Sequence, residues 1–306
     1  MASPPLPIRV LTVGDGDLTA SLALARALGP QIDLTATTFV SEAELTATYA
    51  LAGPCLAELR ERGVRVQHGV DATALSAVRP GLALQHHVLF YHPHLGLGDL
   101  KDSAAHHRRH SVLVAHYLAS AAAMLLPGGV VHLTLCGNQA TTWSAAAHAR
   151  RLGLLSVQAL PTTSAAALLC GPMAEAGCGR SGPGSGPGAE GGGGTPLAPP
   201  RPEWASRRRF RDGALGSKHW LARYGYEHRR THGDVDMRVG NSVELVYRSG
   251  KGSSGGSGGG GGSGGSGGSS SQQQGTSPAT VCGVCGYDWE TAEGLASHVR
   301  HVSVYL

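Results

Sequence analysis

The chain has 306 residues, a net charge of +4 and 46 glycines, about twice the ordinary share of that residue. Its content of 41% hydrophobic and 15% charged residues suits a globular core and argues against disorder throughout. The glycines have no G-X-Y period, no apolar run is long enough to span a membrane, and the start has no secretory signal, so the six cysteines do not suggest a disulfide framework.

The glycine excess is concentrated in two stretches, residues 177–202 and 249–271. Neither stretch can bury enough apolar surface to offset the entropy of ordering it, so both are expected to be flexible spacers. They divide the chain into a large domain at 1–248 with a disordered insertion at 171–203, a Gly/Ser-rich linker at 249–280 and a small module at 281–306.

Short β-branched runs alternate with amphipathic helical patterns through the first 160 residues. Strands are expected at 8–13, 32–38, 64–69, 86–91, 130–136 and 153–160, and helices at 18–28, 41–49, 54–62, 103–126 and 141–152. Ser41 and Glu44 form a capping box at the start of the second helix. This alternation predicts an α/β fold, a Rossmann-like parallel sheet with helices on both faces.

Ligands bind such sheets beyond the carboxyl ends of the strands. The first strand is followed by Gly14, Asp15, Gly16 and Asp17. Thr19 stands where a dinucleotide-binding loop has its third glycine, and the two acids would repel a pyrophosphate. They suit a cationic ligand such as S-adenosylmethionine, which carries a sulfonium and an ammonium. A strand-to-helix turn without a ligand is the alternative.

Two further strands end in polar residues at the same edge. Asp71 follows the third strand and could accept a hydrogen bond from an adenine amino group, or could only cap the next helix. The fourth strand runs into Tyr91, His92, Pro93 and His94, where a methyltransferase would place its target nucleophile.

The motifs VLTVGDGDLTASLALA, LRERGVRVQHGVDAT, HPHLG, MLLPGGVVHLTL and YGYEHRRTHGD together resemble the BMT5-like 25S rRNA (uridine-N3)-methyltransferase domain, over about residues 8–248. The resemblance implies a seven-stranded class I methyltransferase fold, S-adenosyl-L-methionine as methyl donor and a uridine of large-subunit rRNA or the pre-ribosome as partner. It suggests a nuclear, nucleolar location, with the cytoplasm as alternative. It assigns Gly14, Asp15 and Gly16 to the donor loop, Asp71 to the adenine and 242–247 to an antiparallel edge strand.

The sequence departs from the family pattern at two positions. Tyr91 stands where the family often has Asn, and Val40 follows Phe39 where an acidic residue is usual. The alternative function is therefore a catalytically inactive methyltransferase-like zinc-finger protein, acting as an RNA- or protein-binding module.

Methylation of uridine N3 requires loss of the N3 proton, and a neutral imidazole is a suitable base near pH 7. We expect His92 or His94 either to take this proton or to hold the nucleotide, with Tyr91 stacking on or hydrogen-bonding to a base. Because N3 lies on the Watson–Crick edge, the target must be unpaired or extruded. A metal-dependent hydrolase that uses the histidines of HPH (His92 and His94) and of THG (His232) is a weaker alternative, since no acidic partner stands at ligand spacing beside them.

A basic, aromatic stretch precedes the last expected strand. Cations beside aromatic rings suit an RNA backbone and its bases, although a solvated charged loop explains them as well. The candidate RNA-binding residues are Tyr226, His228, Arg229 and Arg230.

The small C-terminal module has the spacing of a C2H2 zinc finger. Cys282 and Cys285 form a C-x2-C pair, and Trp289 and Leu295 stand where such a finger has its core residues. His298 and His301 would complete a structural Zn²⁺ site, with two residues between them where three to five are usual. The alternative is a chance cluster. One finger reads little sequence, so RNA tethering or a protein partner is as plausible as DNA binding.

Overall fold

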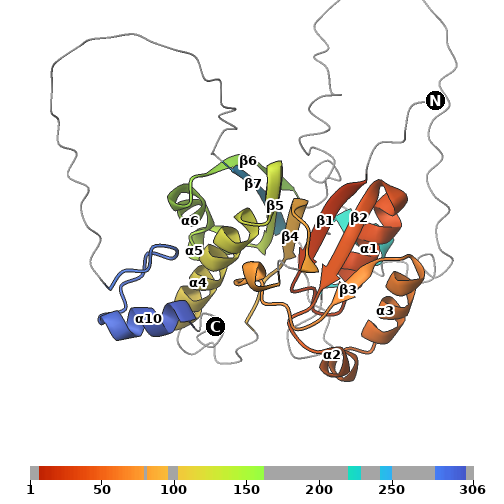
Figure 1. The fold of residues 1–306 in the computed structure, drawn as a ribbon, viewed down its shortest axis with the longest axis horizontal. Coiled ribbons are helices and arrows are strands. Elements are labelled where there is room, and N and C mark those ends of the chain that lie inside the picture. The colour runs from red at the N-terminus through yellow and green to blue at the C-terminus, as the bar shows by residue number, and fades with distance from the viewer. Residues whose placement is uncertain are drawn as a thin grey trace, which may run out of the picture.

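The computed structural model describes residues 7–78, 81–95, 103–161, 220–228, 242–249 and 280–300. Seven strands within these ranges form one sheet in the order β3-β2-β1-β4-β5-β7-β6 (Figure 1). The strands are β1 Ile8–Val13, β2 Ile32–Thr37, β3 Arg65–Gln67, β4 Gln85–Tyr91, β5 Leu125–Cys136, β6 Leu154–Pro161 and β7 Ser242–Ser249. Among these strands, β7 alone runs in the direction opposite to the others. This order and direction are those of the class I methyltransferase sheet, so the predicted fold class is confirmed.

The position of β7 corrects one expectation. Residues 242–247 were expected at the edge of the sheet, but β7 lies between β5 and β6 and pairs with both, which leaves β6 as the edge strand. The reason lies in the side chains: Val246 and Tyr247 of β7 are buried, whereas Leu155 and Val157 of β6 are exposed.

Two layers of helix cover the sheet. The helices are α1 Thr19–Leu28, α2 Glu42–Thr48, α3 Ala52–Glu61, α4 Ser103–Ala122, α5 Gln139–Thr142, α6 Ala145–Arg151 and α10 Ala292–Arg300, with 3-10 turns η1 Gly29–Gln31, η2 Leu75–Ala77 and η5 Trp220–Tyr224. Alternate residues of a strand point to opposite faces. Thus Val10 and Leu89 pack with α1 and α3, whereas Leu11 and Val88 pack with α4 and α6. The core on the α1 and α3 side of the sheet also includes η5, which contacts α1.

Two boundaries differ from those predicted. Helix α4 ends at Ala122 rather than at residue 126, because β5 begins at Leu125 and runs through Pro127-Gly128-Gly129. The pairing of β5 with β4 shifts register there, and a Cβ on Gly129 would lie 2.9 Å from the carbonyl oxygen of Gln85. The helix expected at 141–152 is broken into α5 and α6 at Ser144, whose φ is +55°.

The C-terminal module, residues 280–300, lies beside α4 (Figure 1). A bridge between Val281 and Asp288 closes its turn, and α10 follows. None of the helices in the described ranges has the length and apolar character needed to cross a membrane.

Candidate functional site

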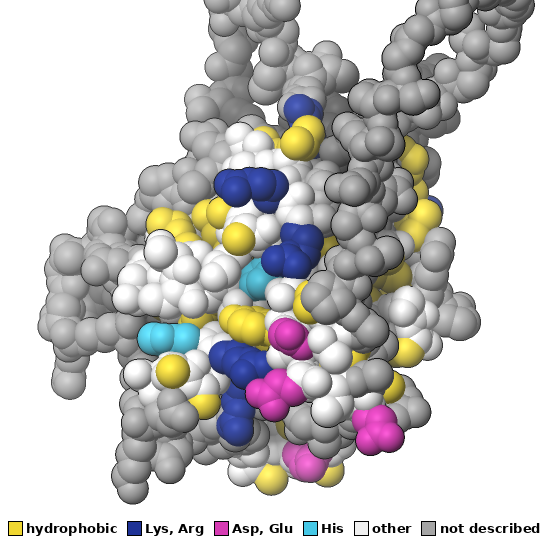
Figure 2. Space-filling view, turned by 90° about the vertical axis from the view of Figure 1, so that its left-hand side faces the viewer, with side chains coloured by type: hydrophobic (Ala, Val, Ile, Leu, Met, Phe, Trp, Pro, Cys, Tyr) yellow, Lys and Arg dark blue, Asp and Glu magenta, His cyan; other side chains and the backbone are white. Residues whose placement is uncertain are grey.

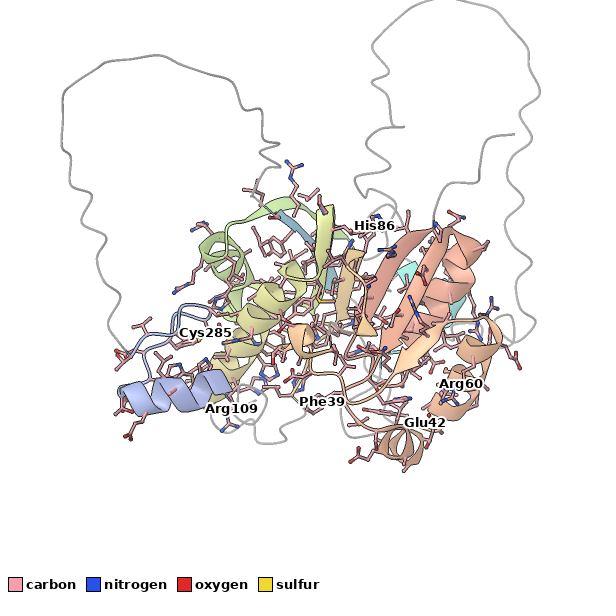
Figure 3. All side chains as sticks on the ribbon, viewed as in Figure 1. Phe39, Glu42, Arg60, His86, Arg109 and Cys285 are labelled. Atoms are coloured by element: carbon pink, nitrogen blue, oxygen red, sulfur yellow. The ribbon has the colours of Figure 1, made fainter. Side chains whose placement is uncertain are left out.

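A pocket of about 280 Å³ opens at the carboxyl edge of the sheet. Its walls come from the ends of β1, β2, β3 and β4 and from the segment after η5. Phe39, which follows β2, lies at this edge, while His86 lies at the opposite end of the sheet (Figure 3). The pocket brings together Gly14, Asp15 and Gly16, which were predicted to form a donor loop, Asp71, which was predicted on the adenine side, and Tyr91, His92 and His94.

The loop after β1 is built around two glycines. Gly14 has a φ of +59°, and a Cβ there would lie 2.5 Å from the Phe90 ring, so this position requires glycine. A Cβ on Gly16 would only reach ordinary contact with Tyr49, 3.7 Å from its hydroxyl. The backbone at Gly16 therefore lines open pocket space, as a closely bound ligand needs.

The two acids of this loop hold the start of α1. Asp15 Oδ2 accepts hydrogen bonds from the backbone N–H of Ser21 at 2.7 Å and from its hydroxyl at 2.5 Å. Asp17 Oδ1 accepts from the N–H of Thr19 at 3.0 Å and from its hydroxyl at 2.7 Å. Burial raises the pKa of the Asp15 carboxyl, against these hydrogen bonds. Both acids line the pocket, so they bring negative charge to it while they satisfy helix N–H groups that lack partners within the helix.

Asp71 serves the turn after β3 and faces the pocket as well. Its Oδ1 accepts from the N–H of Thr73 at 2.8 Å and from the Thr73 hydroxyl at 2.7 Å, which is the local capping role that the sequence allowed. Among the described residues no further partner of the second oxygen, Oδ2, is found, so that oxygen can accept a hydrogen bond from a ligand. Val70 N–H donates to the Thr38 carbonyl at 3.0 Å and joins this turn to the end of β2, next to Phe39.

His92 is held on both sides of its ring. Its Nδ1 lies 2.8 Å from the Tyr226 hydroxyl and its Nε2 lies 2.8 Å from the Ser242 hydroxyl of β7. The backbone N–H of His92 donates to the Thr134 carbonyl at 2.9 Å, and the backbone φ of His92 is +47°, a strained value for a residue with a Cβ. The fold thus over-determines the orientation of this imidazole, a feature that is typical of functional sites.

Tyr91 and His94 flank His92 in different environments. Tyr91 is buried, and burial raises the pKa of its phenol well above the usual value, so the hydroxyl stays protonated. His94 is exposed, and its ring centroid lies 4.6 Å from that of His110 on α4. His92 is buried and is fixed by hydrogen bonds from distant elements.

The segment after η5 supplies a pocket wall. Tyr226 is buried against His92 and does not present a free face to RNA, whereas His228 lies with its ring centroid 4.5 Å from that of His92. Burial lowers the pKa of His228 to about 4, so its imidazole is neutral at pH 7. The other two RNA-binding candidates, Arg229 and Arg230, lie outside the described residues.

Glu227 and Ser242 are pocket or support residues that sequence reasoning missed. Glu227 lines the pocket, and its carbonyl accepts a hydrogen bond from the Thr19 hydroxyl at 3.0 Å. Glu227 is directly adjacent to Tyr226 and His228, which were predicted to bind RNA. Its carboxylate was therefore overlooked within a motif that was interpreted as basic. Ser242 is the first residue of β7, and the sequence of this strand predicts only a strand and no side chain at the site.

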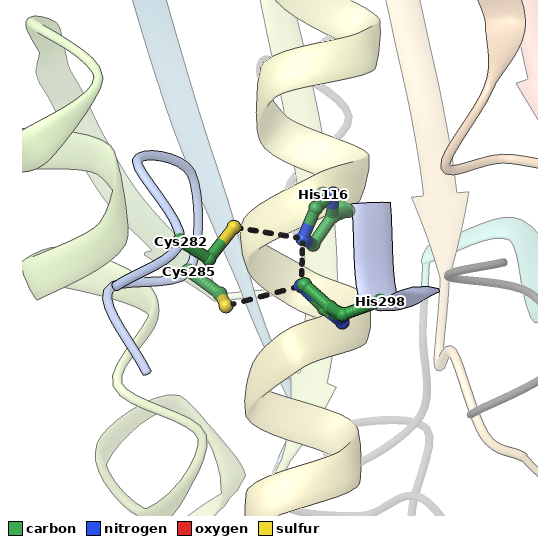
Figure 4. A group of neighbouring side chains, drawn as sticks. All are labelled: His116, Cys282, Cys285 and His298. Carbon is green, nitrogen blue, oxygen red and sulfur yellow. Dashed lines mark hydrogen bonds between the residues drawn. The ribbon is translucent and has the colours of Figure 1, made fainter. Parts of the chain in front are cut away.

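A second cluster lies on the opposite side of α4 from the sheet. His116 of α4 meets Cys282, Cys285 and His298 of the C-terminal module, all four buried (Figure 4). Three of the predicted zinc ligands are therefore brought together, and the fourth, His301, lies outside the described residues. His116 was missed, because nothing in its neighbourhood along the chain has ligand spacing.

A further group of histidines joins the loop after β4 to α4. His94, His106 and His110 lie close together, without a thiol or carboxylate. His110 donates from Nδ1 to the His106 carbonyl at 2.9 Å and accepts at Nε2 from the Leu95 N–H at 3.2 Å. Burial lowers the pKa of His110 to about 4. This neutral ring, hydrogen-bonded at both nitrogens, holds Leu95 of the pocket wall in place and gives no support to a hydrolytic metal centre.

Curated relatives match less than half of the chain. A Mus musculus protein, ferredoxin-fold anticodon-binding domain-containing protein 1 homolog, is 37% identical over 138 residues, which are 45% of this chain and 21% of that protein. An uncharacterized Arabidopsis thaliana protein is 35% identical over 131 residues, 41% of this chain and 62% of that protein. The chain thus spans less than two thirds of the length of these relatives.

Among solved structures, TrmN from Thermus thermophilus is 26% identical, with 50% of this chain and 39% of that chain covered and a TM-score of 0.36. The family whose description is "rRNA (uridine-N3-)-methyltransferase BTM5-like" matches residues 11–163. These residues run from β1 to just beyond the end of β6, through the donor loop, Asp71 and His92. Since the match covers half of its length, the chain belongs to the BMT5-like family.

Proposed function

We propose that this chain is an S-adenosyl-L-methionine-dependent RNA methyltransferase that methylates N3 of a uridine in large-subunit rRNA. The observation that carries the proposal is the single pocket at the carboxyl edge, where the loop at 14–17, Asp71 and His92 line one cavity. The family match adds the substrate class.

The pocket fits the donor by its chemistry. Four acidic residues and no Lys or Arg are among the described residues that line it, and this lining suits a cationic ligand; the acids are Asp15, Asp17, Asp71 and Glu227. In our proposal Asp71 Oδ2 accepts from the adenine amino group, and Phe39, which is 61% exposed beside it, packs on the adenine ring. Bound S-adenosyl-L-methionine would supply an electrophilic methyl group on its sulfonium.

The residues of the chain would orient the uridine and remove its N3 proton. His92 is fixed by Tyr226 and Ser242, so it can position a base edge with little loss of entropy. His228 is neutral at pH 7 and adjacent to His92, so it can accept a hydrogen bond from the uridine N3–H. Because its lowered pKa makes it a weak base, it would take this proton only as the bond from N3 to the methyl group forms, when N3 becomes strongly acidic. Tyr91 keeps its phenolic proton and contributes shape to the wall.

Donor binding is the first test. Titration calorimetry with S-adenosyl-L-methionine and S-adenosylhomocysteine should show binding of both. Asp71→Asn keeps an oxygen for Thr73 but replaces the second acceptor by a donor, and we expect about 10-fold weaker binding from the lost hydrogen bond. The control is Asp33→Asn, an exposed acid at the start of β2 paired with Arg65, which should leave binding unchanged. Absence of binding at millimolar donor would contradict the proposal.

The reaction is tested with RNA. Incubation with large-subunit rRNA that lacks the modification should yield 3-methyluridine, detected by nucleoside mass spectrometry. His92→Gln should abolish the product while donor binding persists, whereas His107→Gln, on the exposed surface of α4, should have no effect. Imaging of a tagged full chain tests the nucleolar location that we propose with this substrate.

A second candidate function is a non-catalytic RNA- or protein-binding module. Two observations favour it. The residue after Phe39 is Val40 rather than an acid, and both ring nitrogens of His92 already have hydroxyl partners. RNA binding with an affinity independent of donor, and without 3-methyluridine formation, would establish this alternative.

A further inference from the structure

We propose that His116, Cys282, Cys285 and His298 bind one zinc ion, so that the fourth ligand of the C-terminal module comes from helix α4 of the methyltransferase domain. The ion would then be a clamp between two parts of the chain, rather than the centre of a self-contained finger closed by His301. This inference is independent of the proposed methyl transfer.

The separations between the ligand atoms are those of a tetrahedral site. His116 Nε2 lies 3.1 Å from His298 Nε2, Cys285 Sγ lies 3.5 Å from His298 Nε2, and Cys282 Sγ lies 3.9 Å from His116 Nε2. Around Zn²⁺, bonds of about 2.05 Å to nitrogen and 2.3 Å to sulfur give edges of about 3.3 Å between two nitrogens and about 3.6 Å between nitrogen and sulfur. These three measured separations lie within about 0.3 Å of the tetrahedral edges, and all four ligand atoms lie within 4.8 Å of one another.

The chemistry of the set is also that of a structural site. Two thiols and two imidazoles are the donors that zinc prefers, and each of the four side chains is at most 8% exposed. No carboxylate belongs to the group and no position is open to solvent for a substrate, as expected for a closed site.

The module uses α4 to complete its core as well as its ligand set. Its two cysteines pack with Val112 and Ala115 of α4, together with Trp289 and Leu295. A segment this short cannot bury a sufficient core alone, so shared packing with α4 is the physical reason for its position. His298 is fixed in turn by Trp289, whose ring stacks on it at 4.1 Å between centroids.

Two arginines of the sheet domain, Arg108 and Arg151, contact the C-terminal module at the edge of its interface with α4. The Arg108 guanidinium of α4 lies 5.0 Å from the Tyr287 ring centroid and 5.1 Å from that of Trp289, and donates to the Asp288 carbonyl at 3.4 Å. Arg151 of α6 lies against Gly286, where a Cβ would find no room. The described residues on this side of the molecule form a band of Arg side chains, with Asp and Glu beside its lower part (Figure 2).

Metal content of the full chain discriminates between the two ligand sets. We expect one equivalent of zinc by elemental analysis of the purified protein and of His301→Asn, and at least a tenfold weaker zinc affinity, measured against a competing chelator, for His116→Asn. Circular dichroism establishes that the His116→Asn sheet domain is folded. Weakening by His301→Asn and not by His116→Asn, or absence of zinc from the wild-type protein, would overturn the proposal.

A second measurement needs no substitution at a ligand. A specific protease site inserted at 251–279 allows the chain to be cut after folding. We expect the C-terminal fragment to co-elute with the domain in size-exclusion chromatography when zinc is present, and to separate when a chelator is added. A fragment that separates while it retains its zinc, or that stays attached after zinc is removed, would contradict a clamp.

Discussion

The pocket at the carboxyl edge takes most of its lining from short stretches that follow consecutive strands, whereas the zinc cluster joins His116 to residues 282–298. Two acids of the pocket have hydrogen-bond partners nearby along the chain without a ligand: Asp15 accepts from Ser21, and Asp71 accepts from Thr73. The four cluster groups face each other instead, with two imidazole nitrogens 3.1 Å apart. The pocket is thus shaped by the fold alone, and the cluster needs an ion to hold its parts together.

Metal removal should produce the largest difference between the two regions. Structural zinc contributes on the order of 10 kcal/mol to the folding of small modules. Addition of a chelator should therefore remove hydrogen-exchange protection at Cys282 and Gly286, whose N–H groups donate to Tyr287 and Cys282 carbonyls. Amides of β1 and β4 should keep their protection. Simultaneous loss of protection in both regions would show that they are not separable.

Gly14→Ala should damage the pocket and leave the cluster intact. The added Cβ would meet Phe90 at 2.5 Å in a left-handed backbone, so we expect a loss of about 2–4 kcal/mol in the free energy of unfolding and loss of donor binding. The matched control is Gly16→Ala, which has room for its methyl group and should cost less than about 1 kcal/mol. Urea unfolding measures both. Equal destabilisation by the two variants would refute the assigned role of Gly14.

Acid should lower the free energy of unfolding through His110, in the first half of α4. Burial lowers the pKa of this imidazole to about 4, from about 6.5 in an unfolded chain, so folding excludes the proton. The contribution of His110 to stability is therefore full above pH 6.5 and is lost as the pH falls from 6.5 towards 4, by about 2 kcal/mol at pH 5.

The measurement compares urea unfolding of the wild-type protein and His110→Gln at pH 7.5 and pH 5. The variant keeps an acceptor for the Leu95 N–H but has no titrating group. Other acid-sensitive groups, including the zinc ligands, are common to both proteins and cancel in the difference. An equal loss of stability in the two proteins would exclude His110 as an acid-sensitive group.

The smallest expected effect concerns the rim of the cluster. Arg108→Gln removes the cation over Tyr287 and Trp289, an interaction of about 0.5–1 kcal/mol at an exposed site. Hydrogen exchange in residues 280–291 should become about threefold faster, with zinc content unchanged. Arg109→Gln, the exposed neighbouring residue labelled in Figure 3, serves as the control and should have no effect. A similar effect of both substitutions would mean that general charge, rather than this contact, holds the module.

Local pattern predicted most of the elements of the sheet domain. The capping box at Ser41 and Glu44 is present, and β1, β2 and β4 lie within one residue of their expected bounds. Prediction failed where pairing overrides local signals: Pro127-Gly128-Gly129 suggests a break, yet β5 continues through it because β4 holds a bulge there. It also failed for β7, whose place between β5 and β6 depends on partners far away in the chain.

The sequence by itself determined the fold class and marked the residues at 14–17 that line the pocket, because both depend on residues close together in the chain. It also marked Cys282, Cys285 and His298 by their spacing. Only the tertiary structure decided that His92 is locked between Tyr226 and Ser242, and that His116 faces the two cysteines. These contacts join residues more than 100 positions apart, and their geometry is set by how the helices and strands pack together.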